Sequence, residues 1–163
     1  MNPTALADSR GRPLACYAID STSNLIGIRV PHTSIVRYLL DKGARLHQIF
    51  EGKTLWQFAV ARACNDGLER SASRDLWVEL LQLLLDYGAN PKVQNSVQIR
   101  QYVGIRRHYD GSSLLVLTDL CRANLLDSNV QRLLTKVKSR STITPDEQAS
   151  IDALKPLPKL QRK

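Results

Sequence analysis

The sequence predicts an all-α protein, a stack of about three helix pairs with a β-hairpin finger between the second and third pairs. Three observations predict this fold class. A glycine-led octet occurs three times along the 163 residues. A second apolar run at helical spacing follows each octet. Two of these runs end in the same Leu-Leu-Asp-x-Gly-Ala motif.

The three octets share one pattern: glycine, a polar residue, a helix starter, leucine, and then a bulky residue before a small one. A glycine in a positive-φ turn followed by an N1 or N-cap residue predicts a turn that opens a helix. The octets begin at Gly11, Gly52 and Gly111, and their helix starters are Pro13, Thr54 and Ser113.

The second helix of each pair is predicted by apolar residues recurring three and four positions apart. In the first two pairs the helix is expected to end at a C-capping glycine, Gly43 or Gly88, and Pro91 prevents continuation of the second. The three runs are Ile35, Val36, Leu39 and Leu40, then Trp77, Leu80, Leu81 and Leu84, then Val130, Leu133, Leu134 and Val137.

Between the second and third pairs, apolar and polar residues alternate with period two, which predicts a β-hairpin. The apolar positions are Val97, Ile99, Val103, Ile105 and Tyr109, and the polar ones are Gln98, Arg100, Arg106 and His108. After the third pair, Thr144 as N-cap and Pro145 at the first helical position predict a short helix to about Leu154.

The Gly-x-Thr opener, the short helix and the Leu-Leu-x-x-Gly-Ala helix end together resemble the ankyrin repeat. The resemblance covers about residues 8–138, in repeats at about 8–44, 49–90 and 108–138. It places a repeat domain at 1–140, followed by a short helix and basic tail at 141–163. Such long, degenerate repeats resemble those at the ends of large multidomain ankyrin proteins.

The sequence departs from the family pattern in two ways. The family's Thr-Pro-Leu-His is replaced by a segment ending in Gln57, which can only imitate the histidine's hydrogen bonds. The spacing from Gly43 to Gly88 is 45 residues against about 33 for a standard repeat. We expect insertions at about Asn65–Arg74 and about Ser21–His32.

Composition and motifs argue against several classes of protein. The hydrophobic fraction of 43% and charged fraction of 23% are typical of a folded globular chain. The sequence lacks a membrane-length apolar run and a secretory signal, so we expect an intracellular protein, cytoplasmic or nuclear. It also lacks a phosphate-binding loop, a nucleophile elbow and zinc-like ligand spacing, so we expect neither an enzyme nor a metal or other cofactor.

The expected function is binding to another protein, because the resemblance implies a concave face made by first helices and turn fingers. The finger positions correspond to about Arg45–Glu51 and Val97–Tyr109. Within the second, we single out a basic segment with interleaved aromatic residues as the candidate partner-binding site: Arg100, Tyr102, Arg106, Arg107, His108 and Tyr109.

The same segment has two other interpretations. In the first, its arginines have no binding role and simply protect an exposed strand edge from aggregation. They could instead bind an anion or nucleic acid, since residues 90–163 carry 13 Lys and Arg against 6 Asp and Glu, whereas residues 1–89 carry 10 against 9. The alternative function is therefore electrostatic binding of nucleic acid or an acidic membrane surface through the basic C-terminal half.

Overall fold

The structure, a computed structural model, describes residues 6–21, 29–66, 71–100, 106–154 and 156. This part of the chain is mostly helical and contains one antiparallel pair of strands. In chain order its elements are α1 (Leu14–Ile19), α2 (Thr33–Asp41), α3 (Leu55–Asp66), α4 (Ser71–Asp86), β1 (Asn95–Arg100), β2 (Arg106–Gly111), α5 (Ser113–Leu120), the 3-10 helix η2 (Arg122–Asn124), α6 (Ser128–Ser139) and α7 (Pro145–Asp152).

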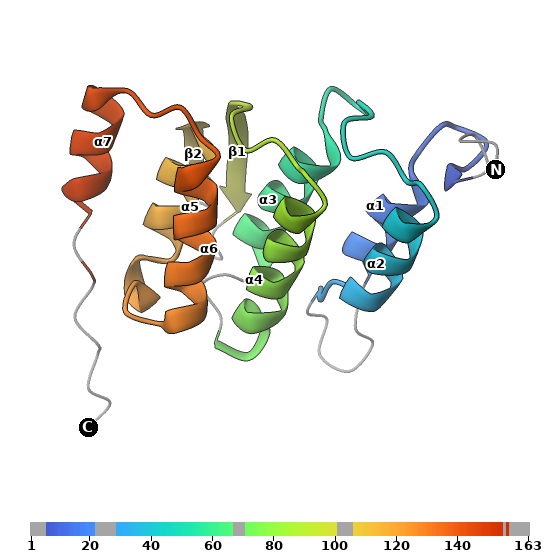
Figure 1. The fold of residues 1–163 in the computed structure, drawn as a ribbon, viewed down its shortest axis with the longest axis horizontal. Coiled ribbons are helices and arrows are strands. Elements are labelled where there is room, and N and C mark those ends of the chain that lie inside the picture. The colour runs from blue at the N-terminus through green and yellow to red at the C-terminus, as the bar shows by residue number, and fades with distance from the viewer. Residues whose placement is uncertain (1–5, 22–28, 67–70, 101–105, 155, 157–163) are drawn as a thin grey trace.

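The helices form two layers, and the helices within each layer lie side by side (Figure 1). Each first helix contacts its own second helix, so α1 packs on α2, α3 on α4 and α5 on α6. Between pairs, α3 contacts both α1 and α5, and α4 contacts both α2 and α6. We call the layer of α1, α3 and α5 the inner layer and the layer of α2, α4 and α6 the outer layer. α7 packs on α5.

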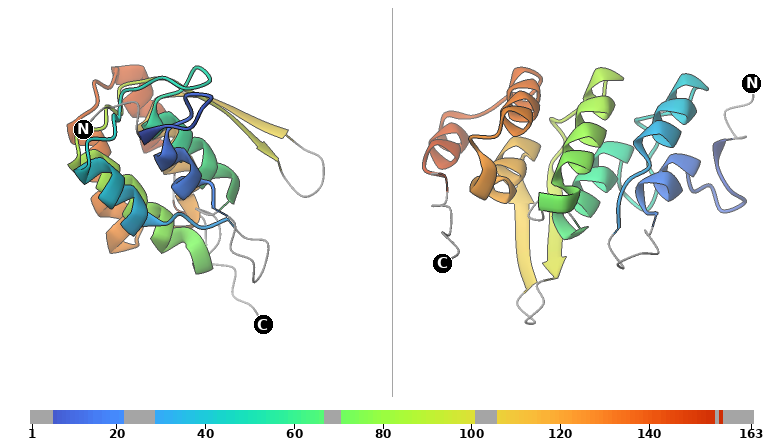
Figure 2. Two further views of the ribbon diagram at one scale, coloured as in Figure 1. Left: turned by 90° about the vertical axis from the view of Figure 1, so that its right-hand side faces the viewer. Right: turned by 90° about the horizontal axis from the view of Figure 1, so that it is seen from below.

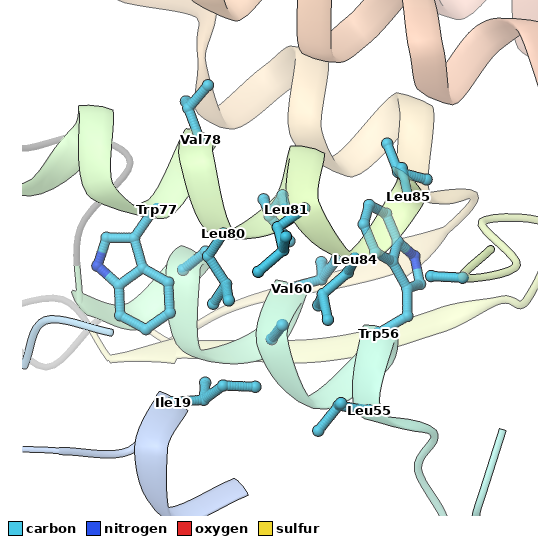
Figure 3. Packing of buried hydrophobic residues seen from close by; sticks show 14 of the residues in the cluster. Ile19, Leu55, Trp56, Val60, Trp77, Val78, Leu80, Leu81, Leu84 and Leu85 are labelled. Atoms are coloured by element: carbon cyan, nitrogen blue, oxygen red, sulfur yellow. The ribbon is translucent and has the colours of Figure 1, made fainter. Parts of the chain in front are cut away.

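The core lies between the layers, and its centre is formed by α3 and α4 (Figure 3). Ala59 and Ala63 on α3 are fully buried, which lets the neighbouring helices approach closely. Trp56 and Trp77 are also buried, as the helical spacing of the sequence predicts. The expected core positions of α2 and α6, such as Val36 and Leu133, are buried too.

The two Leu-Leu-Asp-x-Gly-Ala motifs end α2 and α4 in the same way. Gly43 and Gly88 have φ of 94° and 93°. The amide of Ala44 donates to the carbonyl of Leu39, and the amide of Gly43 donates to that of Leu40. The corresponding bonds are repeated at the end of α4. Both helices therefore end in a Schellman motif, which confirms the C-capping role predicted for these glycines.

The octets open helices as predicted, with one exception in the turn. Gly11 and Gly52 have positive φ, but Gly111 does not, so the prediction of a positive-φ turn is wrong there. The reason is that Gly111 is the last residue of β2, paired with Asn95, and thus has extended backbone. The capping side chain of α5 is that of Ser112, which leaves Ser113 as the first helical residue.

Gln57 makes hydrogen bonds in the turn that opens α3, as its place in the second octet predicts. Its Oε1 accepts from the amide of Thr54 at 2.9 Å, and Thr54 Oγ1 accepts from the amide of Gln57 at 3.3 Å. This reciprocal arrangement is a capping box. The Nε2 of Gln57 also donates to the carbonyl of Gln94 at 2.8 Å, so the start of α3 is joined to the segment that enters β1.

The described residues of the extra length expected at about Asn65–Arg74 are helical. Asn65 belongs to α3 and Arg74 to α4, and residues 67–70 between them lie outside the described part. The second expected insertion, about Ser21–His32, separates α1 from α2, and its residues 22–28 also lie outside that part. The predicted C-terminal helix is present as α7, with Thr144 Oγ1 accepting from the amide of Glu147.

Candidate functional site

The predicted finger is present as a two-stranded antiparallel hairpin. Val97 pairs with Tyr109, Gln98 with His108, Ile99 with Arg107 and Arg100 with Arg106. The hairpin projects from the helices on the side of the inner layer (Figure 2). It is held at its base, where the buried Asn95 and Val97 contact the stack and β1 packs against α3.

The hairpin carries most of the candidate binding residues. Arg100 ends β1, while Arg106, Arg107, His108 and Tyr109 belong to β2. Tyr102 lies outside the described residues, as do the side chains of the three arginines and of Tyr109. His108 is exposed, and its Nε2 lies 2.8 Å from Oδ2 of Asp110 on the same strand. The structure therefore brings the five described positions together in one projecting element.

A second surface is formed by the solvent-facing side of the inner layer. Tyr17 on α1 is exposed, and Phe58 and Arg62 on α3 are half-buried. Leu115 and Asp119 continue this side on α5. Where it meets the hairpin, a pocket of about 310 Å³ is lined by Gly52, Lys53, Gln57 and the four residues Gln94, Asn95, Ser96 and Val97.

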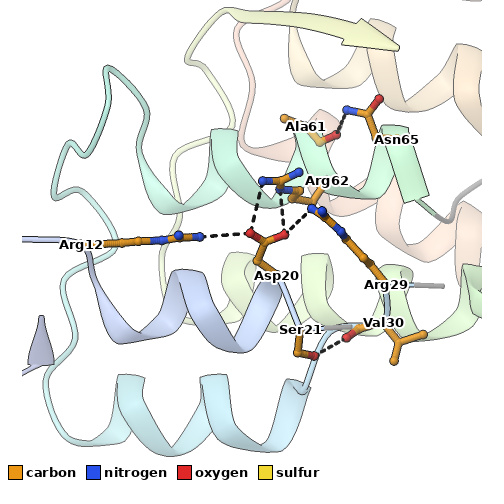
Figure 4. A network of polar contacts seen from close by, with 8 residues as sticks. All are labelled: Arg12, Asp20, Ser21, Arg29, Val30, Ala61, Arg62 and Asn65. Carbon is orange, nitrogen blue, oxygen red and sulfur yellow. Dashed lines mark hydrogen bonds and ion pairs between the residues drawn. The ribbon is translucent and has the colours of Figure 1, made fainter. Parts of the chain in front are cut away.

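A cluster of three arginines around one carboxylate occupies the N-terminal part of this surface (Figure 4). Asp20 follows α1 and forms ion pairs with guanidinium groups from three segments. Arg29 Nη1 lies 2.7 Å from Oδ1, Arg12 Nη2 lies 3.1 Å from Oδ2, and Arg62 approaches both oxygens at 3.3 Å. We name Asp20 and these three side chains the arginine cluster. It joins the first helix pair to α3.

Aromatic rings hold two of the arginines in place. The guanidinium carbon of Arg12 is 4.2 Å from the ring centre of Tyr17 and 5.9 Å from that of Phe58. The same atom of Arg62 is 5.3 Å from the ring of Phe58. Contacts of this kind between a guanidinium and an aromatic face are attractive and fix the plane of the cation.

Asp8 supports this arrangement from the preceding turn. Its Oδ2 accepts from the hydroxyl of Tyr17 at 2.5 Å, and its Oδ1 accepts from the amides of Arg10 and Arg12. The hydrogen bond from Tyr17, followed by that from the amide of Arg12, lowers the pKa of Asp8. The same bond raises the pKa of Tyr17. The ring of Tyr17, which contacts Arg12, is therefore itself held in place by Asp8.

The sequence interpretation missed the arginine cluster. Residues 1–89 are almost neutral overall, so a comparison of charge between the two halves directs attention to the C-terminal half. The available signal was local: Arg12 lies in the turn just before the first helix, Arg62 lies on the solvent-facing side of α3, and Asp20 follows the first helix directly. Their convergence depends on the stacking of α1 on α3.

The three cysteines are buried thiols in different helices or at helix ends. Burial raises the pKa of Cys16 to about 11 and that of Cys121 to about 12. Both side chains are therefore protonated thiols at neutral pH. Among the described residues, no group of three or more His, Cys, Asp or Glu side chains is placed to hold a metal ion.

Comparison with known proteins gives no family assignment. No protein-family model matches the chain, and searches of curated proteins and of solved structures also find no match. Within the described part of the structure, no helix is both long and apolar enough to cross a membrane.

Proposed function

We propose that this chain is a protein-binding module of ankyrin-type repeats, and that the partner lies against the inner layer and the hairpin. The observation that carries the proposal is the position of the hairpin. It projects on the same side as the solvent-facing residues of the inner helices, and Gln57 joins the two by its bond to Gln94. Partners of ankyrin-type stacks bind at a surface of this kind.

The composition of the surface supports the proposal. Tyr17, Phe58 and Arg62 belong to residue types that are enriched in protein interfaces, and tyrosine and arginine are also enriched among the residues that contribute most to binding energy. The ring contacts already restrict Arg12 and Arg62 in the free protein, so less side-chain entropy is lost when a partner binds. The repeated helix ends of α2 and α4 support the repeat assignment itself.

Site-specific photocrosslinking in the host cell tests the proposal. A photoreactive amino acid is placed at Ala61, on the solvent-facing side of α3, and in a second variant at Gln131, an exposed position on α6 of the outer layer. We expect a discrete protein adduct from position 61 and none from position 131. Equal labelling from both positions, or adducts only from position 131, would contradict the proposed surface.

A salt titration separates this function from electrostatic binding of nucleic acid or an acidic membrane surface. The crosslinking is repeated in lysate, with salt added before irradiation. An interface with a packed centre then keeps its yield of adduct as salt increases, since added ions screen mainly exposed charges. Binding through the phosphate backbone or lipid headgroups falls steeply over the same range. Loss of the adduct at position 61 at moderate salt would favour the electrostatic alternative.

A further inference from the structure

The arginine cluster holds more positive charge than its own carboxylate neutralises. Three guanidinium groups surround Asp20, so the four side chains together carry an excess of two positive charges. The nearby carboxylate of Asp8 is engaged by Tyr17 and by two backbone amides. Asp8 keeps its own negative charge in these hydrogen bonds, so with Asp8 included the group still carries an excess of one positive charge.

The hydrogen-bonding capacity of Asp20 is already used. A carboxylate offers about four lone-pair sites. In this cluster, Oδ1 faces Arg29 and Arg62, while Oδ2 faces Arg12 and Arg62. Each guanidinium has five N–H donors, so most donors of the three side chains are directed elsewhere. The Nε of Arg12 is buried and has no hydrogen-bond partner among the described residues.

The arginines are accessible as well as oriented. The exposed fractions of the side chains are 24% for Arg12, 31% for Arg62 and 38% for Arg29, against 19% for Asp20. The outer edges of Arg29 and Arg62 can thus meet a ligand that approaches from solvent. Planar guanidinium forks are suited to bind a carboxylate or phosphate through paired hydrogen bonds.

From this geometry we propose that the arginine cluster is a binding site for an acidic side chain on a peptide segment of the partner, with its oxyanion received by Arg29 and Arg62. This inference rests on the proposed protein-binding function and adds the chemistry of the partner. The oxyanion belongs to Asp or Glu, or to a phosphorylated residue, since both groups can accept paired hydrogen bonds from a guanidinium.

Titration of the full chain with short peptides tests the site directly. The probes are a fluorescein-labelled peptide with five consecutive glutamates, the matched peptide with five glutamines, and a third in which a phosphoserine replaces the central glutamate. Fluorescence anisotropy measures affinity, and the NMR signals of the arginine Nε–H groups report which arginines are contacted. We expect the glutamate peptide to bind and to shift the signals of Arg29 and Arg62, with no response to the glutamine peptide.

Two variants of equal charge locate the site. Arg29→Gln should weaken binding of the glutamate peptide by about threefold to tenfold, the range for a partly exposed charge-assisted contact. Arg132→Gln removes the same charge from the exposed side of α6 in the outer layer and should change affinity by less than about twofold. Equal weakening by both variants would show attraction to net charge alone and would overturn the proposal.

Asp20→Asn distinguishes a binding site from a structural brace. Removal of the competing carboxylate should strengthen binding of the glutamate peptide, even as it lowers the stability of the first helix pair. A cluster that only braces α1 on α3 would lose stability without any gain in affinity, and that result would overturn the proposal. Tighter binding of the phosphoserine peptide than of the glutamate peptide would assign the natural ligand to a phosphorylated segment.

The outcomes for this site and for the proposed function are separable. If none of the acidic peptides shifts the Arg29 or Arg62 signals, the acidic-ligand assignment is wrong, whatever the crosslinking result. A specific adduct at position 61 would then still support protein binding at the inner layer. Conversely, peptide binding at the cluster without any protein adduct at position 61 would overturn the proposed function alone.

Discussion

The indole Nε1 of Trp56 donates to the hydroxyl Oγ of Ser113 at 2.8 Å, across 57 residues of sequence. The Nδ2 of Asn95 donates to the same oxygen, also at 2.8 Å. Ser113 therefore joins α3, β1 and α5 inside the core. These two bonds fix the base of the hairpin relative to the inner helices, which is the relationship on which the proposed binding surface depends.

Ser113→Ala should lower the free energy of unfolding by about 1–3 kcal/mol, because it leaves the indole N–H of Trp56 without its acceptor and removes one of the two acceptors of the Asn95 amide. Chemical denaturation followed by tryptophan fluorescence measures the change. Ser150→Ala is the matched control: Ser150 is exposed on α7, and its replacement should change stability by less than about 0.5 kcal/mol. Equal effects from both variants would show that the buried hydroxyl has no special role.

The two tryptophans give a second comparison. Both are buried, but among the described residues Trp77 Nε1 has no hydrogen-bond partner. Trp56→Phe and Trp77→Phe remove similar volume, so the loss of packing is shared. Trp56→Phe also breaks a buried bond, while Trp77→Phe removes an unpaired N–H group. We expect Trp56→Phe to be more destabilising by about 1–3 kcal/mol in urea unfolding; the reverse order would contradict these hydrogen-bond assignments.

These contacts show which features of the structure the sequence predicts and which it does not. Local patterns predicted the helix openers, the Schellman ends and the hairpin, because each depends on residues close together in the chain. The role of Ser113 was predicted only in part: the sequence places it at the start of a helix, but its partners Trp56 and Asn95 come from other elements. Asp20 and Arg62 likewise converge only when α1 packs on α3. Such long-range contacts leave no periodic signal.

Gly88→Ala should destabilise the protein by about 1–2 kcal/mol, because alanine must adopt the left-handed conformation of this Schellman motif. The φ of Gly88 is 93°, and a Cβ there would meet no atom within 4 Å, so backbone conformation is the cause. Gly88→Asn is the control, since asparagine tolerates this conformation better. Thermal unfolding by circular dichroism should rank wild type, then Asn, then Ala. An alanine variant as stable as wild type would contradict the motif.

The lowered pKa of Asp8 predicts that the stability of the protein depends on pH. This pKa is lowered from 3.8, first by the hydrogen bond from Tyr17. A group whose folded pKa is depressed stabilises the protein above its unfolded pKa and loses this effect as pH falls through the folded value. Asp8→Asn should therefore be less stable than wild type at pH 6, and the difference should disappear in strong acid. Urea unfolding across this range measures it; a difference independent of pH would contradict the assigned role.

The buried thiols predict slow alkylation of the native protein. With the pKa of Cys16 raised to about 11 and that of Cys121 to about 12, little reactive thiolate exists at pH 8. Labelling by iodoacetamide then requires local opening. The helix α1 has only six residues and contacts α2 and α3, whereas α5 packs on α3, α6 and α7, so α1 should open more readily than α5. Peptide mapping by mass spectrometry should find Cys16 modified before Cys121, and both at similar rates in concentrated urea. Rapid native labelling of Cys121 would contradict the packing of α5 between its neighbours.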